Sequence, residues 1–133
     1  MADAASRVRP DLIVLAQDGE LARAAADRGL PVAIVGIADR AYEDDGTLVP
    51  RGQPGAVIHD PSAIVDRTIR MVCEGLIESA SGVDLPIVAD TVLLHGDNPG
   101  AVDLARLIRT ELTAAGVTIA PLAQVLAAKA EAA

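Results

Sequence analysis

The sequence predicts an α/β protein with a mostly parallel sheet, and three observations support this fold class. Short aliphatic runs alternate with segments of helical periodicity along the 133 residues, which is the pattern of βαβ units. The apolar residues are nearly all Ala, Val, Leu and Ile, and aromatic residues make up only 1% of the chain, so the core would pack helices on a sheet through small aliphatic side chains. The length is that of one domain, and we expect a single domain over residues 1–133.

The first elements predict a βαβ unit. Residues 11–16 (DLIVLA) have the pattern of a buried strand, residues 18–28 that of a helix ending at Gly29, and residues 32–37 that of a second strand. Roughly ten helical residues between two buried strands imply a parallel pair with a right-handed crossover.

A polar insert, residues 39–54, follows the second strand. Gly46, Gly52 and two prolines interrupt it, so we expect a long ordered loop or a small hairpin. The acidic residues 43–45 lack the spacing of a calcium loop, and the run predicts a turn.

Two later helices begin with the same signal, a capping side chain followed by proline. Asp60 precedes Pro61 in a helix expected to reach about residue 74, and Asn98 precedes Pro99 in a helix over 99–115. The remaining expected elements are short strands at 55–58, 91–95 and 117–119, a hairpin of 76–78 and 86–88 turning near Ser81 and Gly82, and a last helix at 121–129.

Composition and motifs exclude several classes of function. The net charge is −8, with ten scattered arginines among nineteen acids, which argues against nucleic acid. The apolar runs are far shorter than the ~20 residues of a membrane span, and the first residues do not resemble a signal peptide, so we expect a cytoplasmic protein. No nucleotide-binding loop occurs, so any use of ATP requires another chain. Cys73, the only cysteine, lies in an apolar helical segment and is predicted to be a buried, inert thiol.

The richest group of functional side chains is residues 94–99 (LHGDNP). His95 should lie at the carboxyl end of a strand, where ligands bind in parallel sheets, and the following helix offers free N–H groups to an anion. Imidazole and carboxylate together transfer protons near neutral pH. The alternative is a capped helix, in which Asp97 or Asn98 caps and His95 makes a local hydrogen bond.

A second candidate group lies in the insert and comprises Asp39, Arg40, Tyr42 and Arg51. The two arginines present planar forks of donors that suit a carboxylate or a phosphate. The alternative is a solvated loop held by Arg–Asp pairs. We expect only a structural role for His59, which precedes the cap at Asp60.

Two segments carry a family resemblance. ADRAYEDDGTLVPRGQPGAVIHD (38–60) and LLHGDNPGAVDLARLIRTEL (93–112) closely resemble the second half of LamB/YcsF proteins, in the same order and at the same separation. Residues 11–37 are also similar to that family.

The resemblance implies a fold and an activity. The fold would be a partial (β/α) barrel related to the glycoside hydrolase/deacetylase fold. The activity would be that of the A subunit of the ATP-hydrolysing 5-oxoprolinase, which opens the lactam of 5-oxoproline (pyroglutamate) to L-glutamate together with subunits B and C. ATP would act through that complex. Two alternatives stay open: a hydrolase of another amide or of an acetylated sugar on the same fold, and a non-catalytic interaction module.

The resemblance also implies site residues. His95 would donate or accept a proton at the ring amide, and Asp97 would orient His95 or bind the attacking water. Arg40 or Arg51 would hold the substrate carboxylate or a transferred phosphate, with no metal ion. The full set of substrate-binding residues would be Asp39, Arg40, Tyr42, Arg51 and Asn98. Family members are about twice as long, so we expect a truncated part of the family's protein that is not active alone and needs a complementary N-terminal half or a homo-oligomer.

Overall fold

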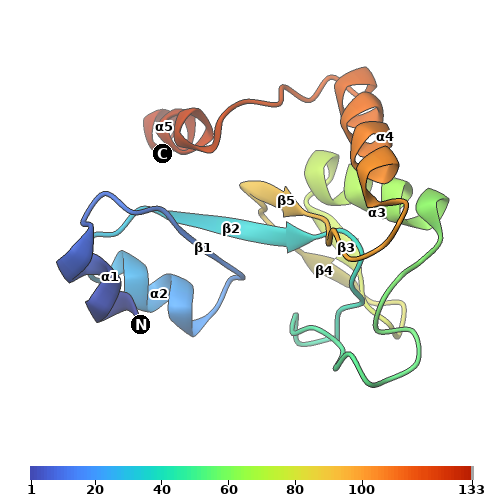
Figure 1. Ribbon diagram of the computed structural model, residues 1–133, viewed down its shortest axis with the longest axis horizontal. Coiled ribbons are helices and arrows are strands. Elements are labelled where there is room, and N and C mark those ends of the chain that lie inside the picture. The colour runs from blue at the N-terminus through green and yellow to red at the C-terminus, as the bar shows by residue number, and fades with distance from the viewer. Residues whose placement is uncertain (133) are drawn as a thin grey trace. The chain divides into compact units, whose positions relative to one another are not determined.

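The computed structural model describes residues 1–132 (Figure 1). These residues form two compact units, each with a core of its own. Unit 1 comprises residues 1–36, 89–91 and the chain from 120 onward, and unit 2 comprises residues 37–88 and 92–119. The single domain expected over residues 1–133 stays a prediction.

Unit 1 contains the predicted βαβ unit. Strand β1 pairs in parallel with β2, and Val14 lies opposite Val32. Gly29, at φ 71°, follows the connecting helix and adopts the left-handed conformation that ends many helices. The bounds of the elements are α1 (Ala2–Val8), β1 (Val14–Ala16), α2 (Glu20–Ala26), β2 (Val32–Ile37) and α5 (Leu122–Ala132).

The core of unit 1 is small and aliphatic. Ala2, Ala25 and Leu30 are buried together, and Val14 and Val32 pack against them. The strand β1 and the helix α2 are both shorter than the ranges predicted from the sequence, 11–16 and 18–28. Their positions and types are as predicted, because the apolar pattern of a segment locates the middle of an element better than its ends.

A polar contact, which the sequence did not indicate, ties α5 to the rest of unit 1. The carboxylate of Asp90, only 5% exposed, accepts hydrogen bonds from the Ile34 backbone N–H at 2.8 Å and from the Lys129 ammonium at 2.8 and 2.9 Å. No residue of α5 is fully buried. The Asp90–Lys129 ion pair is therefore a principal attachment of this helix.

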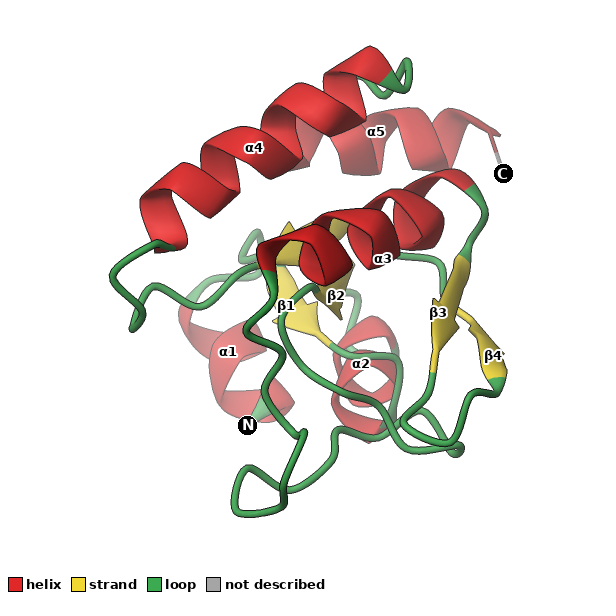
Figure 2. Ribbon diagram, turned by 90° about the vertical axis from the view of Figure 1, so that its right-hand side faces the viewer, coloured by secondary structure: helices red, strands yellow, loops and turns green. Residues whose placement is uncertain are grey.

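Unit 2 contains a helix pair and a hairpin. Figure 2 shows α3 running beside α4 and beside the hairpin of β3 and β4. The hairpin is antiparallel, with Ile77 opposite Leu85. The bounds are α3 (Pro61–Cys73), β3 (Leu76–Glu78), β4 (Asp84–Pro86) and α4 (Ala101–Ala114). The strand β5 (Thr91–Leu93) has its first residue in unit 1 and the other two in unit 2.

The helices of unit 2 bury one apolar face each. Ile64 and Val65 of α3 pack with Leu104, Ile108 and Leu112 of α4, and the three residues of α4 follow one another at the i, i+4 spacing of one helical face. The start of α3 is as predicted: the Asp60 carboxylate accepts a hydrogen bond from the Ser62 N–H at 3.2 Å, and Pro61 occupies the first turn.

Strands β1, β2 and β5 form one sheet in the order β1-β2-β5. The α/β class with a mostly parallel sheet is confirmed. Closure into a barrel and the relation to glycoside hydrolases stay predictions. No helix among residues 1–132 is long and apolar enough to cross a membrane.

Two predicted strands are wrong. Residues 55–58 contribute only an isolated bridge between Arg40 and Val57, because Gly55 adopts a left-handed conformation at φ 78° and turns the chain. Residues 117–119 are not a strand either. The Val117 N–H instead returns to the Leu112 carbonyl at 2.9 Å, so Val117 completes the end of α4.

The prediction for Cys73 is also wrong, because this thiol is exposed. The buried face of α3 consists of Ile64, Val65, Thr68 and Met71. The helical turn therefore places Cys73, the last helical residue, away from that face.

Candidate functional site

The insert after β2 is an ordered loop in which Tyr42 forms an antiparallel bridge with Leu48. The predicted turn is present between them: the Gly46 N–H donates to the Glu43 carbonyl at 3.0 Å, and Gly46 has φ 83°. Glycine adopts this conformation without a steric penalty. The loop returns toward its own start and places its polar side chains within unit 2.

Arg40 and Tyr42 are buried and form part of the internal frame of this loop. The Arg40 guanidinium donates to the backbone carbonyls of Ala56, at 3.0 Å, and Val49, at 2.6 Å. The Tyr42 hydroxyl accepts from the Ile37 N–H at 2.9 Å. Contact of either side chain with a substrate stays a prediction.

Arg67, on α3, also supports this loop. Its guanidinium donates to the Arg40 carbonyl at 3.0 Å and, more weakly, to the Glu78 carbonyl at 3.4 Å. Its Nε is buried without a hydrogen-bond partner among the described residues, and burial lowers the pKa of Arg67. This role of Arg67 was not predicted from the sequence, because an arginine on an amphipathic helix is normally a solvated side chain.

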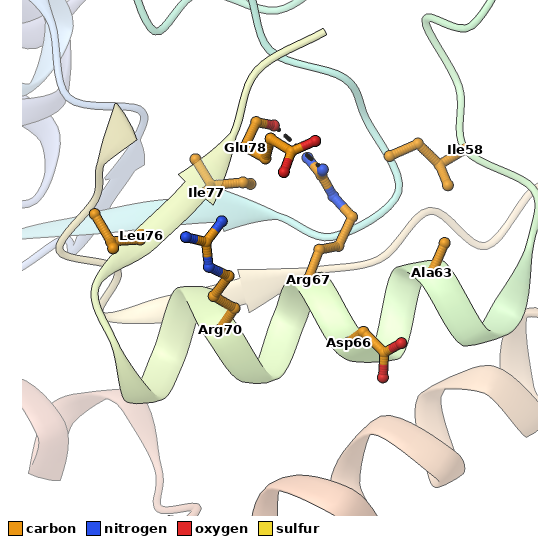
Figure 3. Close-up of a pocket in the computed structure, with 8 residues that line it drawn as sticks. All are labelled: Ile58, Ala63, Asp66, Arg67, Arg70, Leu76, Ile77 and Glu78. Atoms are coloured by element: carbon orange, nitrogen blue, oxygen red, sulfur yellow. Dashed lines mark hydrogen bonds between the residues drawn. The ribbon is translucent and has the colours of Figure 1, made fainter. Parts of the chain in front are cut away.

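Arg67 also lines a pocket of about 310 Å³. Figure 3 shows its side chain directed toward Glu78, with Arg70 and Asp66 on the same helix and Ile77 and Leu76 on β3. Arg70 is engaged elsewhere, in a bidentate ion pair with Asp84 at 2.6 Å. The pocket is therefore an apolar hollow beside two arginines that already have partners.

The central contact of the site joins Asp39 to His95. Nδ1 of His95 lies 2.8 Å from Oδ1 of Asp39, and the His95 backbone N–H donates to Oδ2 of Asp39 at 3.2 Å. The Asp39 side chain is 5% exposed and the His95 side chain 27% exposed. Asp39 follows the end of β2 and His95 follows the end of β5, the sheet edge where α/β proteins bind ligands.

The structure therefore pairs the two candidate groups that the sequence kept apart. Both residues were predicted site residues, but the expected carboxylate beside His95 was Asp97. The carboxylate that holds the imidazole is Asp39, from the polar insert.

Asp97 forms the second link between the two groups. Its carboxylate lies 3.7 Å from an Nη of Arg51, and the two side chains are 70% and 52% exposed. Exposed ion pairs of this kind contribute about 0–1 kcal/mol to stability. Arg51 can therefore exchange its carboxylate partner for another anion at little cost.

Asn98 shapes the turn before α4. Its side-chain oxygen accepts a hydrogen bond from the Gly100 N–H at 2.7 Å, and the helix begins at Ala101 and not at the predicted residue 99. The alternative interpretation of this segment, a helix capped by Asp97 or Asn98, is wrong, because Gly100 is the residue that flanks the start of α4 and no side chain caps this helix. His59, the other histidine, is exposed.

The arrangement is suited to proton transfer and anion binding. A half-buried imidazole held by a carboxylate lies in the same unit as an arginine in a weak, exposed ion pair. Among residues 1–132, no group of three or more His, Cys, Asp or Glu side chains is placed to hold a metal ion.

Comparison with known proteins identifies relatives over most of the chain. The LamB/YcsF family model matches residues 1–127. A protein named as the A subunit of 5-oxoprolinase from Rhodopseudomonas palustris (strain BisB18) is 48% identical over 112 residues, which cover 84% of this chain and 44% of that protein. One of the same name from Coprothermobacter proteolyticus is 46% identical over 129 residues, covering 96% and 49%.

A solved structure is also similar. The lactam utilization protein from Thermus thermophilus superimposes with a TM-score of 0.79 and 34% sequence identity, over 89% of this chain and 47% of that one. The chain thus spans about half the length of the relatives it matches.

Proposed function

Since the chain belongs to the LamB/YcsF family, we propose that it supplies part of the active site of the A subunit of a 5-oxoprolinase, which opens 5-oxoproline to L-glutamate. The Asp39–His95 contact is the observation that carries the proposal. Because the chain spans about half of its relatives, the activity is assigned to an assembly. That assembly comprises this chain, a complementary N-terminal part or a second copy, and subunits B and C.

The reaction is the hydrolysis of a cyclic amide. Water adds to the lactam carbonyl carbon, the C–N bond breaks, and the released nitrogen takes a proton. A five-membered lactam is a poor electrophile, and phosphorylation of its oxygen by ATP would make it a good one. When the C–N bond breaks, the phosphate would remain on the new carboxyl group as an acyl phosphate, and a second water molecule would hydrolyse it to glutamate and inorganic phosphate. ATP would be bound by another part of the complex, because the sequence of this chain has no nucleotide-binding loop.

His95 would transfer the proton in this reaction. Its imidazole is partly exposed and is oriented by a nearly buried carboxylate, which is the arrangement used for general acid–base catalysis. Asp97, two residues after His95 in the sequence, would bind the attacking water.

Arg51 would bind the substrate carboxylate or a transferred phosphate. Arg40 is less suited to this role because its guanidinium already donates to the carbonyls of Ala56 and Val49. Arg51 is half exposed, and its ion pair within residues 1–132 is the loose contact with Asp97. Tyr42 and Asn98 would shape the loops around the substrate.

The test is glutamate release from 5-oxoproline and ATP by the reconstituted assembly. His95→Ala should lower turnover by about 10²–10⁴-fold, as expected for a positioned acid or base. His59→Ala is the matched control, because His59 is exposed and outside the site. Equal and small losses for the two variants would contradict the role of His95. Absence of glutamate release from the wild-type assembly, with turnover of another amide or an acetylated sugar, would contradict the substrate assignment.

A further inference from the structure

We propose that Asp39 is a positioning residue that holds neutral His95 as the Nδ1–H tautomer and thereby makes Nε2 the atom that takes and returns the proton. The tautomer is a property of this chain alone. Its use in ring opening depends on the function proposed above.

The geometry indicates which nitrogen carries the hydrogen. An ionised carboxylate accepts hydrogen bonds and cannot donate them. Asp39 places one oxygen 2.8 Å from Nδ1 and the other 3.2 Å from the backbone N–H of the same residue. Both contacts are satisfied together if Nδ1 bears a hydrogen, and the lone pair is then on Nε2.

The position of the Asp39 carboxylate is fixed by its neighbours in the chain. The Ala38 N–H donates to the Leu93 carbonyl at 2.9 Å, and the Ile58 N–H donates to the Asp39 carbonyl at 3.0 Å. Arg67 holds the next carbonyl, that of Arg40, at 3.0 Å. Hydrogen bonds to three other segments of the chain, namely β5, the loop at Ile58 and α3, therefore fix the backbone on both sides of Asp39.

The burial of Asp39 strengthens its control of the His95 tautomer. The Asp39 side chain is 5% exposed, so water competes weakly for its oxygens, and a hydrogen bond is stronger in such surroundings than in water. His95 is more exposed, at 27%. The pair thus combines a shielded anchor with an imidazole that solvent and substrate can reach.

The proposed step follows from this tautomer. As water oxygen bonds to the carbonyl carbon, one water proton moves to Nε2 and the imidazolium is stabilised by the Asp39 carboxylate. As the C–N bond breaks, the same proton moves from Nε2 to the leaving nitrogen. His95 ends the cycle neutral, and Asp39 remains ionised throughout.

The first test is nitrogen NMR of the full chain with labelled histidine, under mildly alkaline conditions where exposed histidines are neutral. The sequence has only two histidines, and exposed His59 is the internal reference. We expect His95 to show a protonated Nδ1 and an unprotonated Nε2, in contrast to a mixture of tautomers at His59. An Nε2–H tautomer at His95 in the wild-type chain would overturn the proposal without any variant.

The second test is Asp39→Asn. The asparagine amide can donate to Nδ1, so His95 should change to the Nε2–H tautomer, and turnover of the assembly should fall by about 10⁴-fold, with a smaller change in KM. Asp60→Asn is the matched control: this residue precedes α3 next to His59, and asparagine caps a helix as well as aspartate does. Retention of the Nδ1–H tautomer, or of turnover, in a folded Asp39→Asn chain would contradict the proposal.

The outcomes separate the two proposals. In one outcome, His95 is the Nδ1–H tautomer in the wild-type chain and the Nε2–H tautomer in Asp39→Asn, but the wild-type assembly releases no glutamate. This result supports control of the tautomer by Asp39 and contradicts the 5-oxoprolinase assignment. Glutamate release by an assembly whose His95 is the Nε2–H tautomer contradicts the positioning role and leaves that assignment in place.

Discussion

The candidate site contains two carboxylates, Asp39 and Asp97, which differ in their exposure to solvent. Asp39 is nearly buried against His95, whereas Asp97 and Arg51 form a loose pair in solvent. Loss of Asp39 would leave two His95 N–H groups without their acceptor, at a cost of about 1–3 kcal/mol. Loss of the exposed pair costs about 0–1 kcal/mol. Residues at the site therefore differ in whether they support the structure or remain available to a ligand.

The prediction for a single residue concerns Arg51. In the reconstituted assembly, Arg51→Ala should raise KM for 5-oxoproline about tenfold or more, because one charged hydrogen-bond contact to the substrate is lost. The unfolding free energy of the chain should change by less than about 1 kcal/mol. Steady-state kinetics and urea denaturation measure the two effects.

Arg106→Ala is the control for Arg51→Ala. Arg106 pairs with Asp103 on the exposed face of α4 at 3.0 Å, so its removal should alter neither KM nor stability appreciably. Identical KM values for the two variants would show that Arg51 does not bind the substrate.

At the scale of elements, the turn of the polar insert is tied to the β3–β4 hairpin by one carboxylate. The hydroxyls of Ser79 and Ser81 both donate to Oδ1 of Asp44 at 2.6 Å. The bond from Ser79, followed by that from Ser81, lowers the pKa of Asp44 below its ordinary value of 3.8. The contact thus connects two loops that are more than thirty residues apart in the sequence.

This shift predicts a dependence of stability on pH. Because the pKa of Asp44 is lower in the folded chain, its contribution is fully present above pH 3.8 and disappears as the pH falls through the folded pKa. Asp44→Ala should therefore lower the unfolding free energy at neutral pH, and the difference from wild type should shrink in acid. Urea denaturation at a series of pH values measures this.

The double variant with Ser79→Ala and Ser81→Ala is the matched control. It keeps the carboxylate but removes both donors. The difference in unfolding free energy between wild type and this double variant should therefore also shrink as the pH falls. A difference between wild type and Asp44→Ala that stays constant into acid would contradict the assigned hydrogen bonds.

At the scale of the whole molecule, unit 1 is assembled from three separate segments of the chain. Asp90, from the middle segment, contacts Ile34 of the first and Lys129 of the last. Since α5 has no fully buried residue, apolar packing alone holds it weakly.

Lys129→Met tests this assembly. We expect faster amide hydrogen exchange across residues 122–132, because the Asp90 carboxylate would keep only the Ile34 N–H as a donor. The free energy of unfolding should fall by about 1–3 kcal/mol. This loss is smaller than that for a fully buried ion pair, since Lys129 is half exposed. Lys129→Arg, which keeps the charge, is the control. Unchanged exchange in Lys129→Met would show that other contacts hold α5.

The sequence by itself determined the local features of this protein. The aliphatic run of residues 32–37 predicted β2 with its observed bounds, and the Asp60-Pro61 signal predicted the start of α3. The two motifs predicted the family, which is confirmed. Such signals depend on side chains and backbone groups only a few residues apart, so they can be recognised before the chain folds.

The tertiary structure alone decided which of these residues meet. Asp39 and His95 are 56 residues apart, and only the adjacency of the ends of β2 and β5 brings the carboxylate to the imidazole. The burial of Arg40, the exposure of Cys73 and the Asp90–Lys129 pair likewise depend on which face of each element is covered by another. A one-dimensional pattern assigns residues to strands and helices, whereas contacts across a sheet edge follow from strand order, which the pattern of a single segment does not contain.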